Sequence, residues 1–460
     1  MKTDTIAAIA TGMTHSGIGI IRVSGDEAIC VADKIFKAAA KNNKLENAES
    51  HTIHYGFIYD NENVLDEVMV SVMRAPRSFT TEDTVEINCH GGILMMNRIL
   101  ELVIKNGARL AKPGEFTKRA FLNGRIDLSK AEAVMDVISS KNELALKSSV
   151  SQLRGSVSTA IKKLREEIIF EIAFIESALD DPEHISLEGY PEKLLKKVDN
   201  LLISVNKMII SADNGKIVKE GINTVIVGKP NAGKSSLLNL LVGEEKAIVT
   251  DVAGTTRDIL EENIKLHGIG LNIIDTAGIR TTEDVVEKIG VEKAKKYALE
   301  ADLIIYVVDS SVDFDESDYE ILELIQDKKC IVLLNKTDLE AKVSEKNLRD
   351  KIKEDTVIIK TSTRENIGID EFENTIKEMF FKGNISENDE VMITNMRHKE
   401  ALLETFESLQ QVKRSLLDDM PEDFYSIDLM SAYASLGTII GEEVGEDLVN
   451  EIFSKFCMGK

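Results

Sequence analysis

The spacing of hydrophobic positions changes along the chain, and residues 1–120 contain both strand-type and helical spacing. Strand-type runs are expected at Thr5–Ala10, Ile18–Val23, His51–Tyr59, Glu67–Met73 and Thr84–Cys89. Helical spacing predicts helices over Glu27–Ala40 and Gly92–Lys105. Because these strands and helices do not alternate regularly, residues 1–120 are expected to form an α+β domain.

From about Leu128 the apolar residues recur at helical spacing, as on one face of a helix. A single stripe from Val150 to Leu179 predicts one long helix, ended by Asp180-Asp181-Pro182. A second helix is expected over Pro191–Ala212, and helical spacing returns after about Gly383. These two flanks predict an all-α helical bundle domain.

Between the helical flanks, buried strand runs alternate with helical segments. The strands are expected at Ile222–Val227, Leu271–Ile274, Leu303–Val308, Ile331–Leu334 and Val357–Ile359. This alternation is typical of a mostly parallel sheet covered on both faces. The predicted organisation is a multidomain protein. It has an N-terminal domain (1–120), a helical domain in two parts (121–215 and 383–460) and an inserted α/β domain (216–382).

Charge and cysteine content restrict the classes of function. The chain has 460 residues and carries 79 acids against 56 bases, a net charge of −23. A broad nucleic-acid-binding surface should be basic, so any RNA contact is expected to be local or shared with another protein. The cysteines Cys30, Cys89, Cys330 and Cys457 lie far apart, which favours a reduced, cytoplasmic protein without a zinc site. No apolar run approaches the roughly 20 residues that span a bilayer, so no membrane contact is expected.

The segment Gly-Lys-Pro-Asn-Ala-Gly-Lys-Ser, from Gly228 to Ser235, follows an expected strand and begins a helix, as a P-loop does. Its glycines allow backbone N–H groups to surround a phosphate, and the helix N-terminus favours negative charge. Lys234 is expected to bridge the β- and γ-phosphate oxygens as a catalytic residue, and Ser235 to bind Mg²⁺. The segment predicts a nucleoside triphosphate site.

A second motif selects the base. Asn335-Lys336-Thr337-Asp338 ends a strand, where parallel sheets bind their ligands. The Asp338 carboxylate can accept hydrogen bonds from the ring N–H and the exocyclic amine of guanine, a pair of donors that adenine lacks. Ser362 and Thr363 follow the next strand and can supply a backbone N–H to the guanine carbonyl. The expected ligand is therefore GTP.

Two further segments complete the expected site around the γ-phosphate. Asp275 can hold Mg²⁺ through a water molecule, and the Gly278 N–H can sense the γ-phosphate. One of Thr255 and Thr256 can close over Mg²⁺, and Thr256 is the expected ligand. Ile279 stands where Ras-type GTPases have the glutamine that orients the attacking water. Hydrolysis is therefore either slow or dependent on another group. The expected nucleotide contacts are Asn231, Ala232, Gly233, Lys234, Ser235, Ser236, Thr250, Asp251, Val252, Ala253, Gly254, Thr255, Thr256, Asp275, Thr276, Ala277, Gly278, Asn335, Lys336, Asp338, Ser362 and Thr363.

Family resemblance rests on four stretches of the chain. Gly254-Thr-Thr-Arg-Asp258 and Asp275-Thr-Ala-Gly278-Ile279 resemble the Era/EngA/TrmE group of bacterial GTPases. Pro113-Gly-Glu-Phe-Thr-Lys-Arg-Ala-Phe121 and the final Cys457-Met-Gly-Lys460 narrow the resemblance to the MnmE (TrmE) family of tRNA modification GTPases. The resemblance covers the whole chain.

This resemblance implies a homodimer formed through the N-terminal, tetrahydrofolate-binding-like domain. It implies that the protein acts with the flavoprotein MnmG to add a (carboxymethyl)aminomethyl-type group at C5 of the wobble uridine of certain tRNAs. A one-carbon derivative of tetrahydrofolate would supply the carbon, from a site of the kind that holds 5-formyl-tetrahydrofolate.

The resemblance also assigns roles to single residues. It implies a potassium ion that takes the place of an arginine finger. The ligands of this ion would be Asn231, Thr250, Val252 and Thr255. Glu287 matches the glutamate that helps to position water; by itself it reads as a solvated helix residue. The folate contacts match Arg22, Glu86 and Arg125, each of which would otherwise be read as a surface charge, together with Lys460 in the tail. A carboxylate can pair with the pterin donor edge, and a guanidinium can meet the glutamyl tail.

The C-terminal tail has several interpretations. Cys457 stands where a prenylation box has its cysteine, but Gly459 and Lys460 do not fit that motif. A frayed end is the simple alternative. Against it, helical spacing continues almost to the end at Leu448, Ile452, Phe453 and Phe456. We expect these residues to anchor the tail, so that Cys457 and Lys460 reach the folate site and assist one-carbon transfer.

Two other functions remain open at this point. The GTPase domain alone would look the same in a ribosome-assembly factor; the extra N-terminal domain and the lack of a basic C-terminal module argue against this. A membrane-remodelling GTPase with a helical stalk is disfavoured because no polybasic or amphipathic membrane patch is present.

Overall fold

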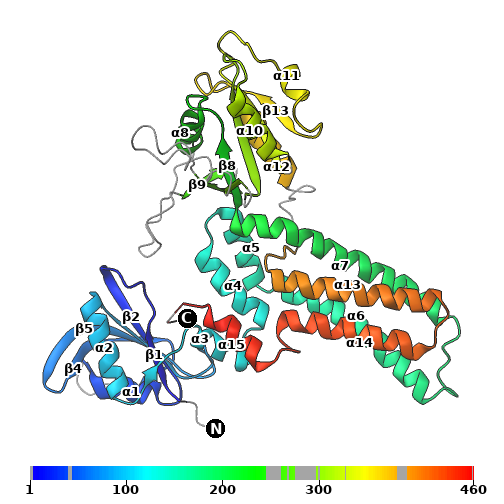
Figure 1. Cartoon of the computed structure of the whole chain (residues 1–460). Coiled ribbons are helices and arrows are strands. Elements are labelled where there is room, and N and C mark those ends of the chain that lie inside the picture. Colours follow the sequence, from blue (N-terminus) through cyan, green and yellow to red (C-terminus); the bar gives the residue numbers. More distant parts are fainter. Residues whose placement is uncertain are drawn as a thin grey trace. The chain divides into compact units, whose positions relative to one another are not determined.

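The computed structural model describes residues 4–39, 44–244, 261–266, 269–274, 297–298, 301–326, 328–380, 391–457 and 459 (Figure 1). The chain divides into two compact units. The first comprises Met1–Met135, Gln152–Val198 and Glu407–Lys460, and the second comprises Asp136–Ser151 and Asp199–Phe406. The division falls inside four helices, α4 (Leu128–Ser139), α5 (Glu143–Leu153), α7 (Tyr190–Glu220) and α13 (Met396–Leu417).

Within its described residues, the first unit holds a 7-stranded sheet in the order β3-β4-β5-β6-β2-β1-β7. Every neighbouring pair is antiparallel except β1 and β7, which are parallel. The strands are β1 (Ile6–Ile9), β2 (Ser16–Ser24), β3 (Phe36–Ala38), β4 (Thr52–Asp60), β5 (Asn63–Met73), β6 (Thr84–Gly91) and β7 (Arg109–Leu110). Helices α1 (Ala28–Ile35) and α2 (Ile93–Lys105) pack on this sheet and close one core with it. The predicted α+β domain is confirmed.

The helix predicted over Glu27–Ala40 was too long. It ends at Ile35, and Phe36–Ala38 form the edge strand β3 beside β4. Phe36 is buried in the core and lies opposite Ile58. Helical spacing continued past Ile35 in the sequence, but pairing with β4 gives the backbone other hydrogen-bond partners.

The single long helix predicted from Val150 to Leu179 was also wrong. It is two helices, α5 (Glu143–Leu153) and α6 (Ser156–Asp180), preceded by α4 (Leu128–Ser139). Gly155 lies between them with a φ of 98°, a left-handed conformation that glycine adopts without strain and that ends a helix. The predicted end at Asp180 is confirmed.

The long helix α6 carries the core of the helical part of this unit. Its stripe Val157, Ile161, Ile168 and Ile175 is fully buried, and α14 (Glu422–Ile440) lies beside it (Figure 1). Further along, α15 (Glu446–Ser454) contacts α3 (Glu115–Leu122). No helix among the described residues combines the length and hydrophobicity that crossing a membrane requires.

The second unit holds a 6-stranded sheet in the order β13-β12-β11-β8-β10-β9. All described pairs are parallel except β9 with β10. The strands are β8 (Ile222–Val227), β9 (Glu261–Leu266), β10 (Ile269–Ile274), β11 (Leu303–Asp309), β12 (Cys330–Asn335) and β13 (Val357–Lys360). The predicted α/β sheet is confirmed, and β9 is an additional strand that was not predicted.

Both faces of this sheet are covered. Side chains that alternate along β8 and β11 enter two separate cores, with Ile226 and Ile305 in one and Val225 and Tyr306 in the other. The helices are α8 (Lys234–Glu244), α10 (Glu316–Ile325), α11 (Glu345–Arg349) and α12 (Ile369–Phe380). The carboxyl ends of β8, β11, β12 and β13 therefore open on one edge, where such sheets bind ligands.

Candidate nucleotide-binding and tail sites

The P-loop joins β8 to α8 in a conformation that its glycines permit. Gly228 has a φ of 149° and Gly233 a φ of 106°. A Cβ at Gly233 would lie 2.1 Å from the side-chain nitrogen of Asn335. Lys234 Nζ donates hydrogen bonds to the carbonyl oxygens of Gly228 at 2.5 Å and of Lys229 at 2.7 Å. The loop thus wraps around its own lysine.

Asn335, at the end of β12, joins three predicted motifs. Its side chain is buried, and its amide nitrogen donates to the carbonyl oxygen of Ala232 in the P-loop at 2.9 Å. Its oxygen accepts a hydrogen bond from the backbone N–H of Thr363 at 3.2 Å. The motif after β13 is fixed in turn, because Ser362 Oγ donates to Asp338 Oδ1 at 2.8 Å.

The neighbouring Lys336 is held by an acid at the end of β11. Its Nζ lies 2.6 Å from Asp309 Oδ2. Burial alone would raise the pKa of Asp309, but hydrogen bonds from Lys336 and Ser311 outweigh it and lower the pKa below its usual value. The Asp309 carboxylate is therefore ionised at neutral pH.

These motifs enclose a cavity of about 630 Å³, a size typical of small-molecule sites. It is lined by Pro230, Asn231, Gly233, Lys234, Ser235, Ser236, Lys336, Asp338, Leu339, Thr363 and Arg364. The structure thus brings the phosphate motif and the base motif to one cavity. Sequence reasoning missed Pro230, Leu339 and Arg364; only their positions beside motif residues could have indicated them.

Several expected contacts lie outside the described residues. These are Thr250, Asp251, Val252, Ala253, Gly254, Thr255, Thr256, Asp275, Thr276, Ala277, Gly278 and Glu287. The described cation candidates are Asn231 and Ser235. Both line the cavity, and both carry a side-chain oxygen atom of the kind that Mg²⁺ and K⁺ prefer. Within the described ranges, no group of three or more His, Cys, Asp and Glu side chains could hold a metal.

A second assembly of predicted residues lies in the first unit. Arg22 on β2 and Glu86 on β6 are cross-strand partners, and Arg22 Nε donates to Glu86 Oε1 at 2.8 Å. Arg22 Nη1 also donates to the carbonyl oxygen of Gly459 at 3.1 Å. The C-terminal tail therefore contacts this ion pair. Lys460 itself lies outside the described residues.

The tail is fixed by packing just before it. Phe453 and Phe456 are buried with Val449 against Leu128 of α4. The expected anchor Leu448 is instead 39% exposed, because Val449 faces the cluster at that turn of α15. The Cys457 side chain is exposed, while its carbonyl oxygen accepts the Gly114 N–H at 3.3 Å.

The third expected folate contact lies apart from this pair. Arg125 Nη1 donates to the carbonyl oxygen of Phe79 at 2.8 Å, and its guanidinium lies 5.0 Å from the Phe79 ring centroid. Arg22 lies 5.7 Å from the Phe116 ring in the same way. Both rings belong to one small apolar cluster, which links the two arginines without direct contact.

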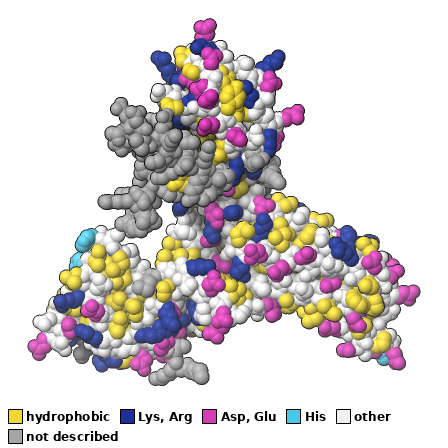
Figure 2. Space-filling model, in the orientation of Figure 1, with side chains coloured by type: hydrophobic (Ala, Val, Ile, Leu, Met, Phe, Trp, Pro, Cys, Tyr) yellow, Lys and Arg dark blue, Asp and Glu magenta, His cyan; other side chains and the backbone are white. Residues whose placement is uncertain are grey.

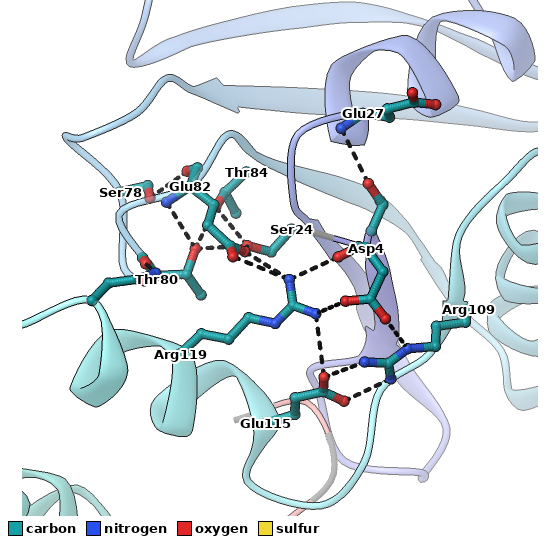
Figure 3. A network of polar contacts seen from close by, with 12 residues as sticks. Asp4, Ser24, Glu27, Ser78, Thr80, Glu82, Thr84, Arg109, Glu115 and Arg119 are labelled. Carbon is teal, nitrogen blue, oxygen red and sulfur yellow. Dashed lines mark hydrogen bonds and ion pairs between the residues drawn. The ribbon is translucent and has the colours of Figure 1, made fainter. Parts of the chain in front are cut away.

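A charged network fixes the loop that carries Phe79 (Figure 3). Arg119 of α3 is almost buried and pairs with Glu82 at 3.0 Å, with Asp4 at 2.7 Å and with Glu115 at 3.2 Å. Ser24 Oγ donates to Glu82 Oε2 at 2.9 Å. The network ties the start of β1, α3 and the loop before β6 together.

The comparisons with known proteins agree with this architecture. Residues 5–125 match the family model described as "GTP-binding protein TrmE N-terminus", and residues 128–457 match the "MnmE helical domain". The protein named tRNA modification GTPase MnmE of Lachnoclostridium phytofermentans is 60% identical, with 100% of both chains covered. Those of Acetivibrio thermocellus and Thermoanaerobacter pseudethanolicus are 51% and 48% identical, again with 100% of each chain covered.

An α/β sheet whose P-loop and guanine motif meet in one cavity, joined to an α+β domain and a helical domain, defines a multidomain P-loop GTPase. The full-length matches then specify the family. The chain belongs to the MnmE (TrmE) family of tRNA modification GTPases.

Proposed function

We propose that this protein binds and hydrolyses GTP and uses the reaction in the modification of tRNA. The observation that carries the proposal is the cavity lined by the P-loop, Asp338 and Thr363, beside which the buried Asn335 side chain bonds both Ala232 of the P-loop and Thr363. The names of the full-length relatives support the tRNA step. The role of Lys234 is to neutralise charge on the β- and γ-phosphate oxygens.

Cations are proposed to complete the catalytic site. Ser235 would bind Mg²⁺, and Asn231 would contribute to a K⁺ site beside the phosphates. Asn231 lies in the P-loop with a φ of 62°, a left-handed backbone conformation that asparagine tolerates. A monovalent cation there would supply positive charge to the developing γ-phosphate charge, as an arginine finger does.

The N-terminal domain is proposed to bind a one-carbon derivative of tetrahydrofolate. The reactive end of the folate would be held by Arg22, Glu86 and the C-terminal tail. Glu86 offers hydrogen-bond acceptors to a pterin. The side chain of Cys457, two residues before Gly459 of the tail, is exposed. Folate chemistry at this place would account for the contact between Arg22 and a segment 437 positions away.

A homodimer and a flavoprotein partner, MnmG, are part of the same proposal. On the sheet of the first unit, Ile53 and Tyr55 of β4 and Met69 of β5 are all more than half exposed, and Tyr55 lies opposite Met69. Figure 2 shows hydrophobic side chains gathered over this domain. Exposed apolar residues in such a group favour a protein contact.

The proposed domain limits remain those of the sequence, with the nucleotide domain over 216–382. The division into two compact units is drawn differently because α4, α5, α7 and α13 each contribute residues to both. Limited proteolysis would test the limits at 215 and 382.

The deciding experiment compares cells that lack this protein with cells that express it. Mass spectrometry of total tRNA should show the loss of the C5 group from wobble uridine, and purified protein should hydrolyse GTP. Normal modification with altered ribosomal subunit ratios would favour the alternative, a ribosome-assembly factor.

A further inference from the structure

The second residue of the P-loop, Lys229, stands at a position that the Gly-x4-Gly-Lys-Ser pattern leaves open. Lysine side chains usually extend into solvent, but this one is only 14% exposed. Its Nζ lies 2.6 Å from Asp318 Oδ2 and 3.1 Å from Asp315 Oδ2, and it donates to the carbonyl oxygen of Asp313 at 3.2 Å. These three partners belong to the loop after β11 and the first turn of α10. The side chain of Lys229 therefore ties the P-loop to α10.

Asp318 is a fixed acceptor for this lysine. It is almost fully buried, and its Oδ1 atom accepts a hydrogen bond from the Tyr306 hydroxyl at 2.8 Å. Burial raises the pKa of Tyr306, so the hydroxyl keeps its proton and remains a donor. The Asp318 Oδ2 atom also accepts the backbone N–H of Asp315 at 3.0 Å, as part of the capping box of α10. Because both carboxylate oxygens are held by other groups, the carboxylate cannot follow a displaced lysine.

The lysine is charged, which makes the contact hard to break. Burial would lower the pKa of Lys229, but the hydrogen bonds to Asp318 and Asp315 outweigh it and raise the pKa above its usual value. A buried carboxylate that loses its cation is left with an uncompensated charge. The Lys229–Asp318 pair is therefore a durable link between the P-loop and α10.

The backbone of the same residue holds the lysine at the end of the P-loop. Lys234 Nζ donates to the carbonyl oxygen of Lys229 at 2.7 Å and to that of Gly228 at 2.5 Å. Gly228 lies directly against β11, since an added Cβ would be 2.3 Å from the carbonyl oxygen of Val307. Both carbonyl groups that receive the Lys234 ammonium thus belong to residues that neighbouring elements fix. Gly228 is fixed by packing and Lys229 by its side chain.

We propose that Lys229 is a positioning residue for GTP hydrolysis, because its pairing with Asp318 fixes the backbone carbonyl that holds the Lys234 ammonium. The inference rests on the proposed GTP hydrolysis. Lys234 neutralises charge that grows on the phosphate oxygens in the transition state, so its placement affects the rate. The backbone N–H groups of the loop continue to bind the phosphates when this ammonium is displaced. Loss of the Lys229 anchor should therefore lower kcat more than GTP affinity.

The test measures kcat in Mg²⁺ and K⁺ at saturating GTP, and GTP affinity by fluorescence titration, on the full-length protein. Lys229→Met removes the ammonium and keeps most of the side-chain length. Its kcat should fall by at least about tenfold, because a displacement of about 1 Å in a catalytic group can cost about 10²-fold in rate. Its GTP affinity should change much less. The control Lys342→Met removes an exposed lysine 3.7 Å from Asp313 in the same loop, and should leave kcat unchanged.

A second variant separates positioning from stability. Lys229→Met alone leaves Asp318 buried without its cation, which should lower the melting temperature. The double variant Lys229→Met with Asp318→Asn removes both charges, so its melting temperature should lie closer to that of the wild type. Its kcat should stay as low as that of the single variant, because the anchor is still missing. A rate that returns together with the melting temperature would mean that the pair only stabilises the domain, and the inference would be wrong.

The inference and the proposed function fail in different ways. An unchanged kcat in Lys229→Met would show that Lys234 needs no such support; this overturns the inference and leaves GTP hydrolysis standing. A wild-type protein that hydrolyses no GTP would contradict the proposed function itself.

Discussion

The side-chain amide of Asn335 donates a hydrogen bond to the carbonyl oxygen of Ala232 at 2.9 Å, and so joins the guanine motif to the P-loop. Thr363 donates to the same side chain from the next motif. One buried residue thereby sets the distance between the places where the base and the phosphates bind.

Replacement of this residue should weaken nucleotide binding, because it removes the link between the two motifs. Asn335→Ala leaves the buried Ala232 carbonyl and Thr363 N–H without their partner, at a cost of about 1–3 kcal/mol each. We expect GTP affinity to fall by at least tenfold in fluorescence titrations. The matched control is Asn272→Ala, since Asn272 bonds Glu220 and Asn223 in the same unit. Equal losses in both variants would contradict the bridging role.

Asp338→Asn should shift the preference from guanine to xanthine nucleotides. The amide can donate to the C2 carbonyl of xanthine, which would repel a carboxylate. Hydrogen bonds to charged groups contribute about 1.5–3 kcal/mol each, so the change in preference should be at least tenfold. Competition of GTP and xanthosine triphosphate for the variant measures it. Unchanged GTP affinity would show that Asp338 does not read the base.

GTP hydrolysis should depend on the monovalent cation, because Ile279 replaces the water-orienting glutamine. An arginine-finger equivalent accelerates hydrolysis by about 10³ or more, so rates in K⁺ should exceed those in Na⁺ by well over tenfold. Asn231→Ala should remove most of the difference and still bind GTP. Equal wild-type rates in the two salts would rule out the potassium site.

Removal of the C-terminal tail should abolish tRNA modification and leave GTP hydrolysis in place. A chain ending at Phe456 keeps the buried anchor and loses Cys457–Lys460, so GTP hydrolysis in K⁺ should persist while tRNA modification is lost. Mass spectrometry of wobble uridine measures the second effect. Modification at the normal rate would make the tail irrelevant to the chemistry.

Gly459→Ala provides a gentler version of the same test. Gly459 has a φ of 86°, and an added Cβ would lie 2.3 Å from the carbonyl oxygen of Ile9. The tail must therefore leave its place beside Arg22, and modification should fall. Gly445→Ala is the control, because a Cβ there meets nothing within 4 Å.

His90 should titrate above its usual range. The hydrogen bond that the His90 Nδ1–H donates to Asp66 Oδ1, at 2.6 Å, is the main cause that raises the pKa of this exposed imidazole. A raised pKa stabilises the fold while His90 is protonated. That contribution is complete below the unfolded value near about 6.5 and is lost as the pH rises through the folded value. A proton NMR titration should show the shift, and Asp66→Asn should remove it; identical titrations would disprove the coupling.

Elements with strong local patterns were predicted well. The antiparallel strands around Ile21 and Ile87 and the parallel strands around Ile226 and Leu333 carry apolar runs that are typical of buried strands. Errors arose where a tertiary contact replaced the local preference. Phe36 has helical spacing in the sequence but pairs with β4 as part of β3. Gly155 separates α5 from α6, although the apolar residues have the same helical spacing on both sides of it.

The sequence by itself determined the ligand class and the reaction, because the P-loop and Asn335–Asp338 recognise GTP through short segments of adjacent residues. The tertiary structure decided which residues those segments contact. Asn335 bonds Ala232 103 positions away, and Arg22 bonds Gly459 across 437 positions. The contact between Lys229 and Asp318 likewise exists only in the fold. Such contacts depend on how whole elements pack against one another, and local spacing carries no record of that packing.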